Sequence, residues 1–553
     1  MSSLRPPGLG PIVGHTTDRT CRLWMQAPRA ELDKRSSEED RRTIGVLVVV
    51  AAAGAAIPVR ARPVFYFRLR REFERTGTFN LGEERSLGER GEPWPLAPDT
   101  EYRVRLASLA LDDNLDNDAH LASTELADLL PRPEVWAGVV DDLPAECEAC
   151  FRTFPAADQV ADALAFLIGS CRYPGLLWKV KESDQIFGPM LAAMTGEQGG
   201  VRPRFVVMAG DQIYADAFNK IIPIGLADTH EEFTDRYQRA FGSLNMRRLL
   251  RNATTYMILD DHEIEDNWCQ GRIRKPSKKM LFNLAIGAYM SYQWSHGPRS
   301  FGRRLYYQFE SGGYPFFTLD TRTQRYIDDV PDSLADNHML GRPALDPAEP
   351  GQLEVLCAWL ARQQQTRGNV PKFIVTSSVF VPNPVSAIGG ASVAAIEDTD
   401  SWPAFPNTRR AILRTIVAHG VQNVVFLAGD VHCSHVAQMY FRGGHDCERL
   451  RAFSVVSSAF YWPFPFADGD PSEFVHDSQD ARTPDTFQID DGVTMDYRAW
   501  NFSQEDNFCR VTAVRDRHAL VVEVLGRDGK PIAVRGPLRT PVDLTSHLDL
   551  APW

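Results

Sequence analysis

Six short apolar runs of this sequence each end in side chains that can bind a metal ion or transfer a proton. The residues at these ends are Cys171, Asp211 with Tyr214, Asp260-Asp261-His262, Asp320 with Arg322, Ser377-Ser378, and Asp430 with His432. Carboxylates, a thiol, a phenol and imidazoles gathered at one sheet edge would be electrostatically unstable unless cations neutralised them. The pattern therefore predicts a pair of bound metal ions, which could clamp a hydroxide and a phosphoryl oxygen together.

The stretch RFVVMAGDQIYAD, residues 204 to 216, shows the pattern most clearly. Its apolar part, 205 to 209, is too short for a helix and predicts a buried strand, and Gly210 allows a sharp turn. Asp211 and Tyr214 then follow the carboxyl end of that strand, where ligands bind in open α/β sheets. A strand with an ordinary polar loop would explain this stretch alone, but its repetition at other strand ends favours a site. Asp216 gains no role and is interpreted as structural.

The strands that carry these residues alternate with helical segments after about residue 160, which is typical of a layered α/β core. Two helices are predicted from apolar residues that share one face: Phe233, Tyr237, Ala240, Phe241 and Leu244 in the first, and Leu353, Leu356 and Leu360 in the second. Residues 397 to 406 are predicted to form a loop over the site. Residues 508 to 529 are β-rich and are expected at the edge of the second sheet, with Asp528-Gly529 as a turn.

The first 160 residues are β-rich, with strands predicted at 21–26, 64–71 and 100–110. The apolar run 43–59 contains Gly54 and Pro58 and is slightly too short to span a membrane, so we expect two sandwich strands and their turn. The charged segments 36–42 and 111–120 are predicted to be solvated loops. Cys147 and Cys150 form a CxxC without a second pair, so we interpret them as incidental cysteines rather than a zinc site.

Composition limits the class of protein. The chain has 553 residues, 44% of them hydrophobic, and a net charge of −12, which argues against a general nucleic-acid binder or a nucleic-acid scaffold. Nine scattered cysteines do not predict a disulfide framework and fit a reducing compartment. The start of the chain lacks a basic segment followed by an apolar one, so no signal peptide or transmembrane segment is predicted and a cytoplasmic location is expected.

Five motifs, GSCRYPG, GDQIYAD, DDHEIEDN, LDTRTQR and GDVHCSH, occur in this order between about residues 160 and 470. Together they resemble the alkaline phosphatase D (PhoD-like) family of calcineurin-like metallophosphoesterases. The resemblance implies an α/β fold with a four-layer core, in which two facing mixed sheets are flanked by helices. A small fibronectin-like β-sandwich, residues 1–160, would precede the catalytic domain, residues 161–553. The implied activity is metal-dependent hydrolysis of phosphodiesters and phosphomonoesters by a metal-bridging hydroxide.

The resemblance also implies the metal ligands, carried over position by position. Asp211 would bridge both ions; Cys171, Tyr214 and His432 would hold the first, and Asp261 and Asp430 the second. Compared with the common metallophosphoesterase pattern, Cys171 replaces an Asp, and Asp261 and Asp430 replace an Asn and a His.

The best-known family members use ferric iron with calcium. A phenolate and a thiolate suit ferric iron, while a site built mainly of carboxylates suits calcium, manganese or magnesium.

The remaining polar residues receive less specific predictions. Arg322 would offer a fork for the phosphate, and His262 either protonates the leaving oxygen or bridges carboxylates structurally. His435 would support the ligands from behind, Asp266 and Asn267 are spare ligands or cap the next helix, and Ser377 and Ser378 are structural.

The sequence leaves two alternatives to phosphate-ester hydrolysis open. The first is a phospholipase D-like phosphodiesterase that acts on lipid head groups, for which the aromatic stretch FYWPF, residues 460 to 464, could form the entrance. Packing is the simpler role for that stretch. The second is a catalytically silent binding protein, whose mark would be broken ligand positions, and none of the six is broken.

Overall fold

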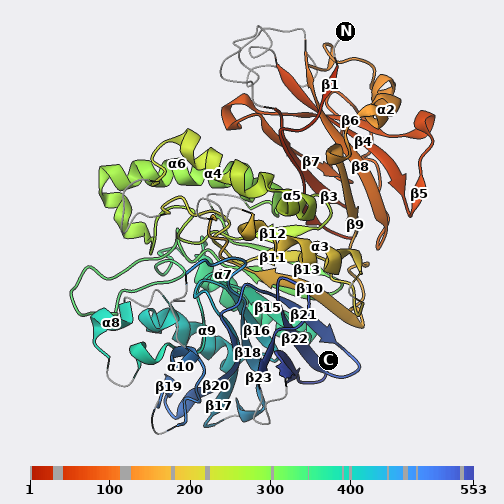
Figure 1. The fold of residues 1–553 in the computed structure, drawn as a ribbon. Coiled ribbons are helices and arrows are strands. Elements are labelled where there is room, and N and C mark those ends of the chain that lie inside the picture. Colours follow the sequence, from red (N-terminus) through yellow and green to blue (C-terminus); the bar gives the residue numbers. More distant parts are fainter. Residues whose placement is uncertain are drawn as a thin grey trace.

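The computed structural model describes residues 3–28, 42–111, 126–175, 181–197, 199–217, 225–300, 304–346, 348–388, 391–397, 401–444, 447–464, 471–480, 482, 484–535 and 541–553. A β-sandwich formed by the N-terminal residues lies at one end of the molecule and a layered α/β part at the other (Figure 1). The predicted loops 36–42 and 111–120 lie almost wholly outside the described residues. Residues 398–400 of the loop expected over the site also lie outside them.

Two sheets form the sandwich in the described part of the chain. One has three strands, β2-β3-β7, and the other has the path β1-β8-β4-β5 with β6 and β9 joined to β4 and β8. Their bounds are β1 (Leu4–Arg5), β2 (Leu9–Thr16), β3 (Cys21–Gln26), β4 (Thr43–Ala52), β5 (Ala55–Ala56), β6 (Val64–Arg68), β7 (Thr76–Leu81), β8 (Glu101–Ala110) and β9 (Glu148–Arg152). Inward and outward residues alternate along the first half of β8, as a strand with one face on a core requires. The three predicted strands are confirmed.

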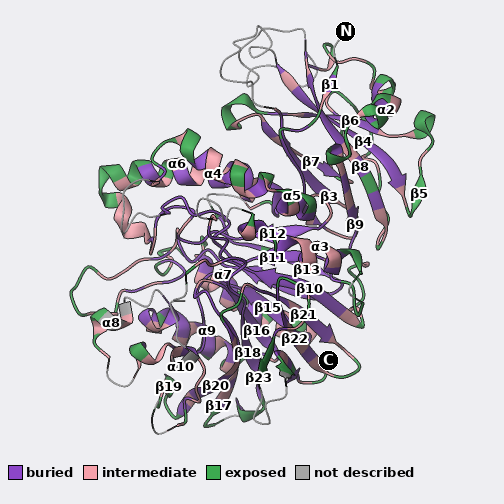
Figure 2. Ribbon diagram, viewed as in Figure 1, coloured by how far each residue is buried: buried purple, intermediate pink, exposed green. Residues whose placement is uncertain are grey.

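The apolar run after Thr43 is β4, which is buried along nearly its whole length (Figure 2). One face of β4 packs into the sandwich core through Leu47 and Val49, and the other packs through Val46 against Trp136 of helix α2 (Trp136–Val139). A strand buried on both faces has no reason to alternate, which explains its likeness to a membrane span. The turn at Ala53-Gly54 leads into β5 as expected, and no helix among the described residues is long and apolar enough to cross a membrane.

Two larger sheets face each other in the layered part. The first has the order β12-β11-β10-β21-β22-β25 and the second β13-β14-β15-β16-β18-β17-β20-β19. Strands of the first sheet are β10 (Ala163–Gly169), β11 (Val206–Met208), β12 (Thr255–Met257), β21 (Phe508–Val514), β22 (Ala519–Leu525) and β25 (Thr545–Asp549). Strands of the second sheet are β13 (Tyr307–Ser311), β14 (Tyr314–Thr318), β15 (Lys372–Val375), β16 (Val424–Ala428), β17 (Ser434–Arg442), β18 (Ala452–Val456), β19 (Phe487–Asp490) and β20 (Val493–Ser503), and β23 (Ala533–Arg535) pairs with β24 (Pro541–Asp543) outside both.

Aromatic side chains fill the space between the two sheets. Phe166 of β10 stacks on Phe205 at 5.2 Å between ring centroids and meets Phe316 of β14 edge-on at 5.4 Å. Ring pairs in these geometries add to the stability gained by burial. This aromatic core fixes the two sheets face to face, so loops from both can contribute to one site.

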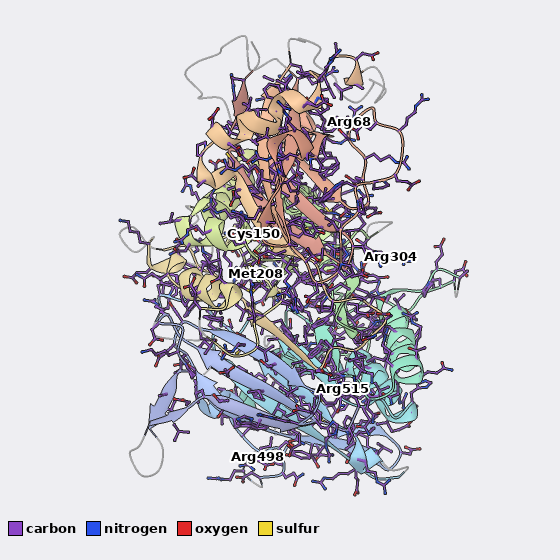
Figure 3. All side chains as sticks on the ribbon, turned by 90° about the vertical axis from the view of Figure 1, so that its right-hand side faces the viewer. Arg68, Cys150, Met208, Arg304, Arg498 and Arg515 are labelled. Carbon is purple, nitrogen blue, oxygen red and sulfur yellow. The ribbon has the colours of Figure 1, made fainter. Side chains whose placement is uncertain are left out.

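Helices cover the outer faces of the two sheets. Those on the first sheet are α3 (Phe187–Thr195), α4 (His230–Gly242), α5 (Leu244–Leu250) and α6 (Pro276–Tyr292). Those on the second are α7 (Gln352–Arg367) and α9 (Pro406–Ala418), and α8 (Val393–Glu397) and α10 (Pro471–Phe474) are short. Figure 3 shows the same arrangement from the side, with Arg68 on the sandwich and Arg498 at the opposite end. The four layers confirm the predicted fold class, while the domain boundary at residue 160 stays a prediction.

Two details differ from expectation. Leu244 does not share the buried face of α4 but is 71% exposed, because the helix ends where Ser243 adopts an extended conformation and Leu244 begins α5. Strand β21 lies inside the first sheet, antiparallel to β10, rather than at the edge of the second, whereas Asp528 and Gly529 form the predicted turn, which follows β22. The predicted faces of Phe233, Tyr237 and Phe241 in α4 and of Leu356 and Leu360 in α7 are buried as expected.

Candidate metal centre

The loops that follow β10, β11, β12 and β16 meet at one edge of the facing sheets. Strands β10, β11 and β12 are parallel neighbours, so their carboxyl ends lie together. The amide of Cys171 donates to the carbonyl of Gly210 at 3.1 Å, and the amide of Arg172 donates to the carbonyl of Asp211 at 2.9 Å. These backbone bonds hold the thiol beside the carboxylate.

Four of the six predicted ligands have left-handed backbone conformations, with φ of 56° at Cys171, 54° at Asp211, 76° at Asp430 and 52° at His432. Such conformations are uncommon for residues other than glycine and cost on the order of 1 kcal/mol or more each. They concentrate where side chains must be aimed at a site. The backbone here is shaped to turn these four side chains inward.

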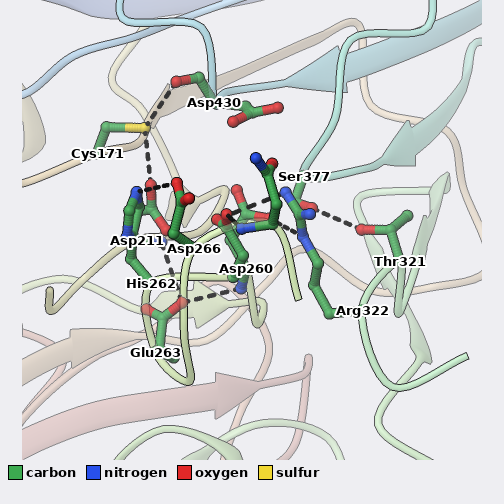
Figure 4. Close-up of polar contacts among 12 residues, drawn as sticks. Cys171, Asp211, Asp260, His262, Glu263, Asp266, Thr321, Arg322, Ser377 and Asp430 are labelled. Carbon is green, nitrogen blue, oxygen red and sulfur yellow. Dashed lines mark hydrogen bonds and ion pairs between the residues drawn. The ribbon is translucent and has the colours of Figure 1, made fainter. Parts of the chain in front are cut away.

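In the first group, ligand atoms of Cys171, Asp211 and His432 lie within 4.8 Å of one another, and Figure 4 shows the Cys171 sulfur between Asp211 and Asp430. The Tyr214 hydroxyl lies 3.2 Å from Oδ2 of Asp211 and 3.2 Å from Nε2 of His432. The sulfur of Cys171 lies 3.4 Å from the same Asp211 oxygen. Donors of these types at these spacings form a suitable set for one transition-metal ion.

A second set of carboxylates adjoins the first. Asp260, Asp261 and Asp430 can place one oxygen each within 4.8 Å of one another, and Asp211 and Asp261 form a further group with His262. Asp211 therefore belongs to groups on both sides, which is the position a bridging carboxylate must occupy.

The electrostatics of the first group favour a bound cation. Burial and the neighbouring Asp211 carboxylate raise the pKa values of the Cys171 thiol and the Tyr214 phenol, so both keep their protons without a cation. Burial, together with Asp260 and Asp261, also raises the pKa of Asp211. Its buried Oδ1 has no hydrogen-bond partner among the described residues. A cation would supply that missing partner and lower all three pKa values, so the residues present fit a metal pair.

The segment that holds most of the predicted ligands matches a known protein family. A family model described as PhoD-like phosphatase matches residues 182–462, just over half of the chain. The chain belongs to the PhoD-like phosphatase family. Alkaline phosphatase D of Bacillus subtilis (strain 168) is 24% identical over 252 residues, which cover 42% of this chain and 41% of that relative. A solved structure described as "Structure of PhoD" has 16% identity and a TM-score of 0.57, covers 99% of this chain and 90% of its own, and shows the same fold.

Arg322 of this PhoD-like chain is fully buried among the carboxylates. Its Nε donates to Asp260 at 2.5 Å, and its guanidinium lies 3.5 Å from Asp261. Burial alone would lower the pKa of Arg322, but Asp260 and Asp261 outweigh burial and raise it. Arg322 therefore balances charge at the second group, and the predicted contact with a phosphate stays a prediction.

His262 is the histidine best placed to hold a proton at the PhoD-like centre. Its Nδ1 lies 2.7 Å from Oδ1 of Asp216, its ring stacks on Tyr214 at 4.3 Å, and its side chain is 19% exposed. Burial alone would lower the pKa of His262, yet Asp261, Asp216 and Asp211 raise it well above the usual value. A protonated imidazole that remains accessible has the properties of a general acid.

Asp216 is a functional residue that the sequence interpretation missed. Besides His262, it accepts a hydrogen bond at 2.6 Å from the amide of Asp266, and it is buried. The signal that could have found it is its place in GDQIYAD, beside two ligands. Its carboxylate orients His262 and stabilises the charged form of the imidazole.

We expect Asp216→Asn to move the alkaline limb of the pH–rate profile to lower pH. An acid works only while protonated, so activity falls as the pH rises through the pKa of His262. Removing one of the carboxylates that raise this pKa should lower it by about one unit or more. The measurement is kcat/KM between pH 6 and 10 with an alkyl phosphate ester, and an unchanged alkaline limb would contradict the role of Asp216.

Glu263 is the second residue that sequence reasoning missed. Its buried carboxylate accepts from the amides of Gln212 at 2.7 Å, Asp260 at 2.9 Å and Asp211 at 3.2 Å, and burial raises its pKa to about 7. It therefore joins the loops after β11 and β12 that carry the ligands. The signal that could have found it is its place in DDHEIEDN, directly after Asp261 and His262.

The other predictions have mixed outcomes. His435 lies on β17 with Nδ1 3.8 Å from the Cys433 sulfur, and burial lowers its pKa to about 3; it is in none of the candidate metal groups found among the described residues. The cap prediction for Asp266 and Asn267 is wrong, since the next helix, residues 270–274, has Cys269 as its N-cap. The amide of Asn267 instead donates to Asp261 at 2.5 Å.

The two serine positions fit the structural interpretation, and the cysteine pair lies not in a loop but in a 3-10 turn, residues 145–147, and in β9. Ser377 lies 2.5 Å from the Thr321 hydroxyl, and both Ser377 and Ser378 are buried. Cys147 is buried and Cys150 is half-buried, and neither belongs to a metal group within the part of the chain that the structure describes.

The aromatic stretch 460–464 partly lines the PhoD-like centre. Trp462 stacks on His432 with ring centroids 3.5 Å apart, Tyr173 meets Trp462 edge-on, and Phe464 is 38% exposed. Phe460, by contrast, is buried against Phe187 of α3 and serves packing. An apolar wall therefore stands beside one predicted ligand.

Proposed function

We propose that this PhoD-like chain hydrolyses phosphate esters, both diesters and monoesters. The observation that carries the proposal is the meeting of Cys171, Asp211, Tyr214 and His432 with the carboxylates of the second group at one sheet edge. Family membership supports the same reaction. A phosphate ester is the partner that this centre implies, and the net charge of −12 gives no support for a role as a nucleic-acid scaffold.

The donor sets support two different ions. The thiol, phenol, imidazole and carboxylate of the first group suit ferric iron, and the carboxylates of the second suit calcium, with manganese or magnesium as substitutes. Asp211 would bridge the two. When bound, such a pair would supply a Lewis acid for the phosphoryl oxygens and the attacking hydroxide that the family resemblance implies.

The chain's own residues supply the remaining steps. His262 holds a proton on its imidazole and gives it to the leaving oxygen, while Asp216 keeps the ring in place. Arg322 fixes Asp260 and balances the surplus of negative charge around the centre. Glu263 keeps the two ligand loops in register through the backbone amides it binds.

The test combines activity, metal content and colour. We expect the purified full chain to hydrolyse nitrophenyl and bis-nitrophenyl phosphate, to lose activity when chelators remove its metals, and to regain it with iron and calcium. A phenolate on ferric iron should give a visible charge-transfer band, which Tyr214→Phe should weaken strongly. Zinc as the sole metal, with full activity, would contradict the assignment of Cys171 and Tyr214.

A phospholipase D-like diesterase is the second candidate, favoured by the wall of Trp462, Tyr173 and Phe464 beside His432. Such an enzyme should prefer short-chain phospholipids over nitrophenyl esters in kcat/KM, and Trp462→Ala should reduce that preference. Absence of activity above background in the metal-loaded normal chain on every substrate, as in Asp211→Ala, would instead favour a silent binding protein.

A further inference from the structure

A groove unrelated to the metal centre lies between the sandwich and helix α6. Its volume is about 640 Å³, within the range of sites for small molecules. One wall is formed by residues of β6 and β7 and of the segment 84–87, and the other by α6 and residues 294–299. None of the proposed metal ligands lines it.

The base of the groove is apolar and aromatic. Trp24 and Phe79 are fully buried beneath it, Met290 and Trp294 are half-buried, and Phe73 at its edge is 49% exposed. The indole nitrogen of Trp24 donates to the carbonyl of Ser291 at 2.9 Å, which fastens the sandwich to α6. The groove is thus a fixed feature between two packed elements, with apolar surface that burial of a hydrocarbon chain would remove from water.

A glycine in the middle of α6 keeps the groove open. Gly287 lines the groove, and a Cβ built on it meets no atom within 4 Å. Glycine inside a helix costs roughly 1 kcal/mol relative to alanine. Helix α6 thus carries a destabilising glycine at a position where a larger side chain would occupy the groove.

The rim of the groove is positively charged. Among the residues that the structure describes, Arg68, Arg70, Arg85 and Arg299 line it together with one acidic residue, Glu84. Glu84 forms an ion pair with Arg299, Arg70 lies 3.7 Å from Glu72, and Arg85 is exposed. A surplus of arginines around an apolar base is notable in a chain of net charge −12. Guanidinium groups bind carboxylates and phosphates through paired hydrogen bonds.

We propose that this groove binds a single-chain anionic amphiphile. The hydrocarbon chain lies along Met290, Trp294 and Phe73, over the space left by Gly287, and the carboxylate or phosphate head pairs with Arg85 and its neighbours on the rim. A cationic head group would face like charges there. This site does not depend on the hydrolytic activity.

The test is calorimetric titration of the full chain with dodecanoate, dodecyl phosphate and dodecyltrimethylammonium, each below its micelle concentration. We expect one saturable site for the two anions and at least tenfold weaker binding of the cation. Dodecanoate carrying a terminal bromine should quench tryptophan fluorescence less in Trp294→Phe than in the normal chain. Similar affinity for all three amphiphiles would overturn the anionic assignment.

Variants separate this site from general hydrophobic binding. Gly287→Leu should abolish binding by filling the groove, and Arg85→Glu, on the exposed rim, should weaken it at least tenfold. Met280→Leu, at a 62% exposed position on the same helix outside the groove, is the control and should change nothing. All three should hydrolyse nitrophenyl phosphate normally. Unchanged binding in both Gly287→Leu and Arg85→Glu would overturn the proposal, and Arg85→Glu alone decides it should Gly287→Leu fail to fold.

Discussion

Asp211→Asn is expected to lower kcat/KM for bis-nitrophenyl phosphate by at least about a thousandfold, a loss of about 4 kcal/mol of transition-state stabilisation. Asp211 belongs to candidate groups on both sides of the centre, so losing its charge weakens both metal sites at once. Asparagine keeps the size of the side chain. The measurement is steady-state kinetics together with metal content per chain, which should also fall.

Asp211→Asn lowers activity and metal content, but it should not lower the stability of the protein once the metals are removed. The pKa of Asp211 is raised in the folded chain, chiefly by burial, so between its unfolded pKa near 4 and its folded pKa the folded state binds the extra proton. Stability of the metal-free protein therefore falls as the pH rises through that window. Metal-free Asp211→Asn lacks this penalty and should melt at the same or a higher temperature at pH 8.

The matched control is Asp184→Asn, which makes the same chemical change at another buried carboxylate. Asp184 accepts from the amides of Asn245 at 2.7 Å and Met246 at 3.0 Å at the start of α5 and belongs to none of the candidate metal groups among the described residues. We expect this variant to melt at a lower temperature yet keep its metals and activity. A metal-replete, fully active Asp211→Asn would contradict the bridging role.

His262→Gln is expected to have an effect that depends on the leaving group. A general acid contributes roughly a hundredfold to ten-thousandfold when the leaving oxygen is basic, because an alkoxide must be protonated as it departs. Nitrophenolate leaves without a proton. The variant should therefore lose activity within that range on an alkyl phosphate ester and only a few-fold on nitrophenyl phosphate.

Comparing the two substrates distinguishes the alternatives for His262. Equal losses on both would mean that the imidazole only bridges Asp216 and its neighbours, which is the structural role left open by the sequence. His547→Gln, at an exposed position on β25, should leave both rates unchanged.

Most of the fold could be predicted because its signals are local. The strands before Asp211 and Asp430 are short apolar runs ended by glycine turns, and helix α4 has a clear apolar face formed by Phe233, Tyr237 and Phe241. Leu244 was misplaced because its periodicity continues across a break at Ser243 that depends on backbone conformation. The position of β21 beside β10 depends on pairing over hundreds of residues, which no local pattern encodes.

Part of the candidate site could likewise be predicted from the sequence, and part of it could not. The proposed ligands sit in motifs, so their types and order were visible in the sequence. Asp216 and Glu263 also sit in motifs, but they act through hydrogen bonds to His262 and to backbone amides, and these partners follow from three-dimensional placement. The burial of Arg322 between Asp260 and Asp261 was likewise invisible, since sequence shows a charge but not what faces it.

The left-handed backbone at Cys171, Asp211, Asp430 and His432 restricts which residues these positions can exchange for. Aspartate, asparagine and histidine adopt that conformation more readily than most residues, and β-branched side chains are strongly disfavoured there. Substitutions among Asp, Asn and His at these positions could therefore create a new ligand set at modest conformational cost. Cysteine is not one of the residues that favour the left-handed conformation. Replacing Cys171 with aspartate would therefore reduce the backbone strain at this position while changing the metal preference. The shape of the chain thus makes some metal specificities easier to reach by mutation than others.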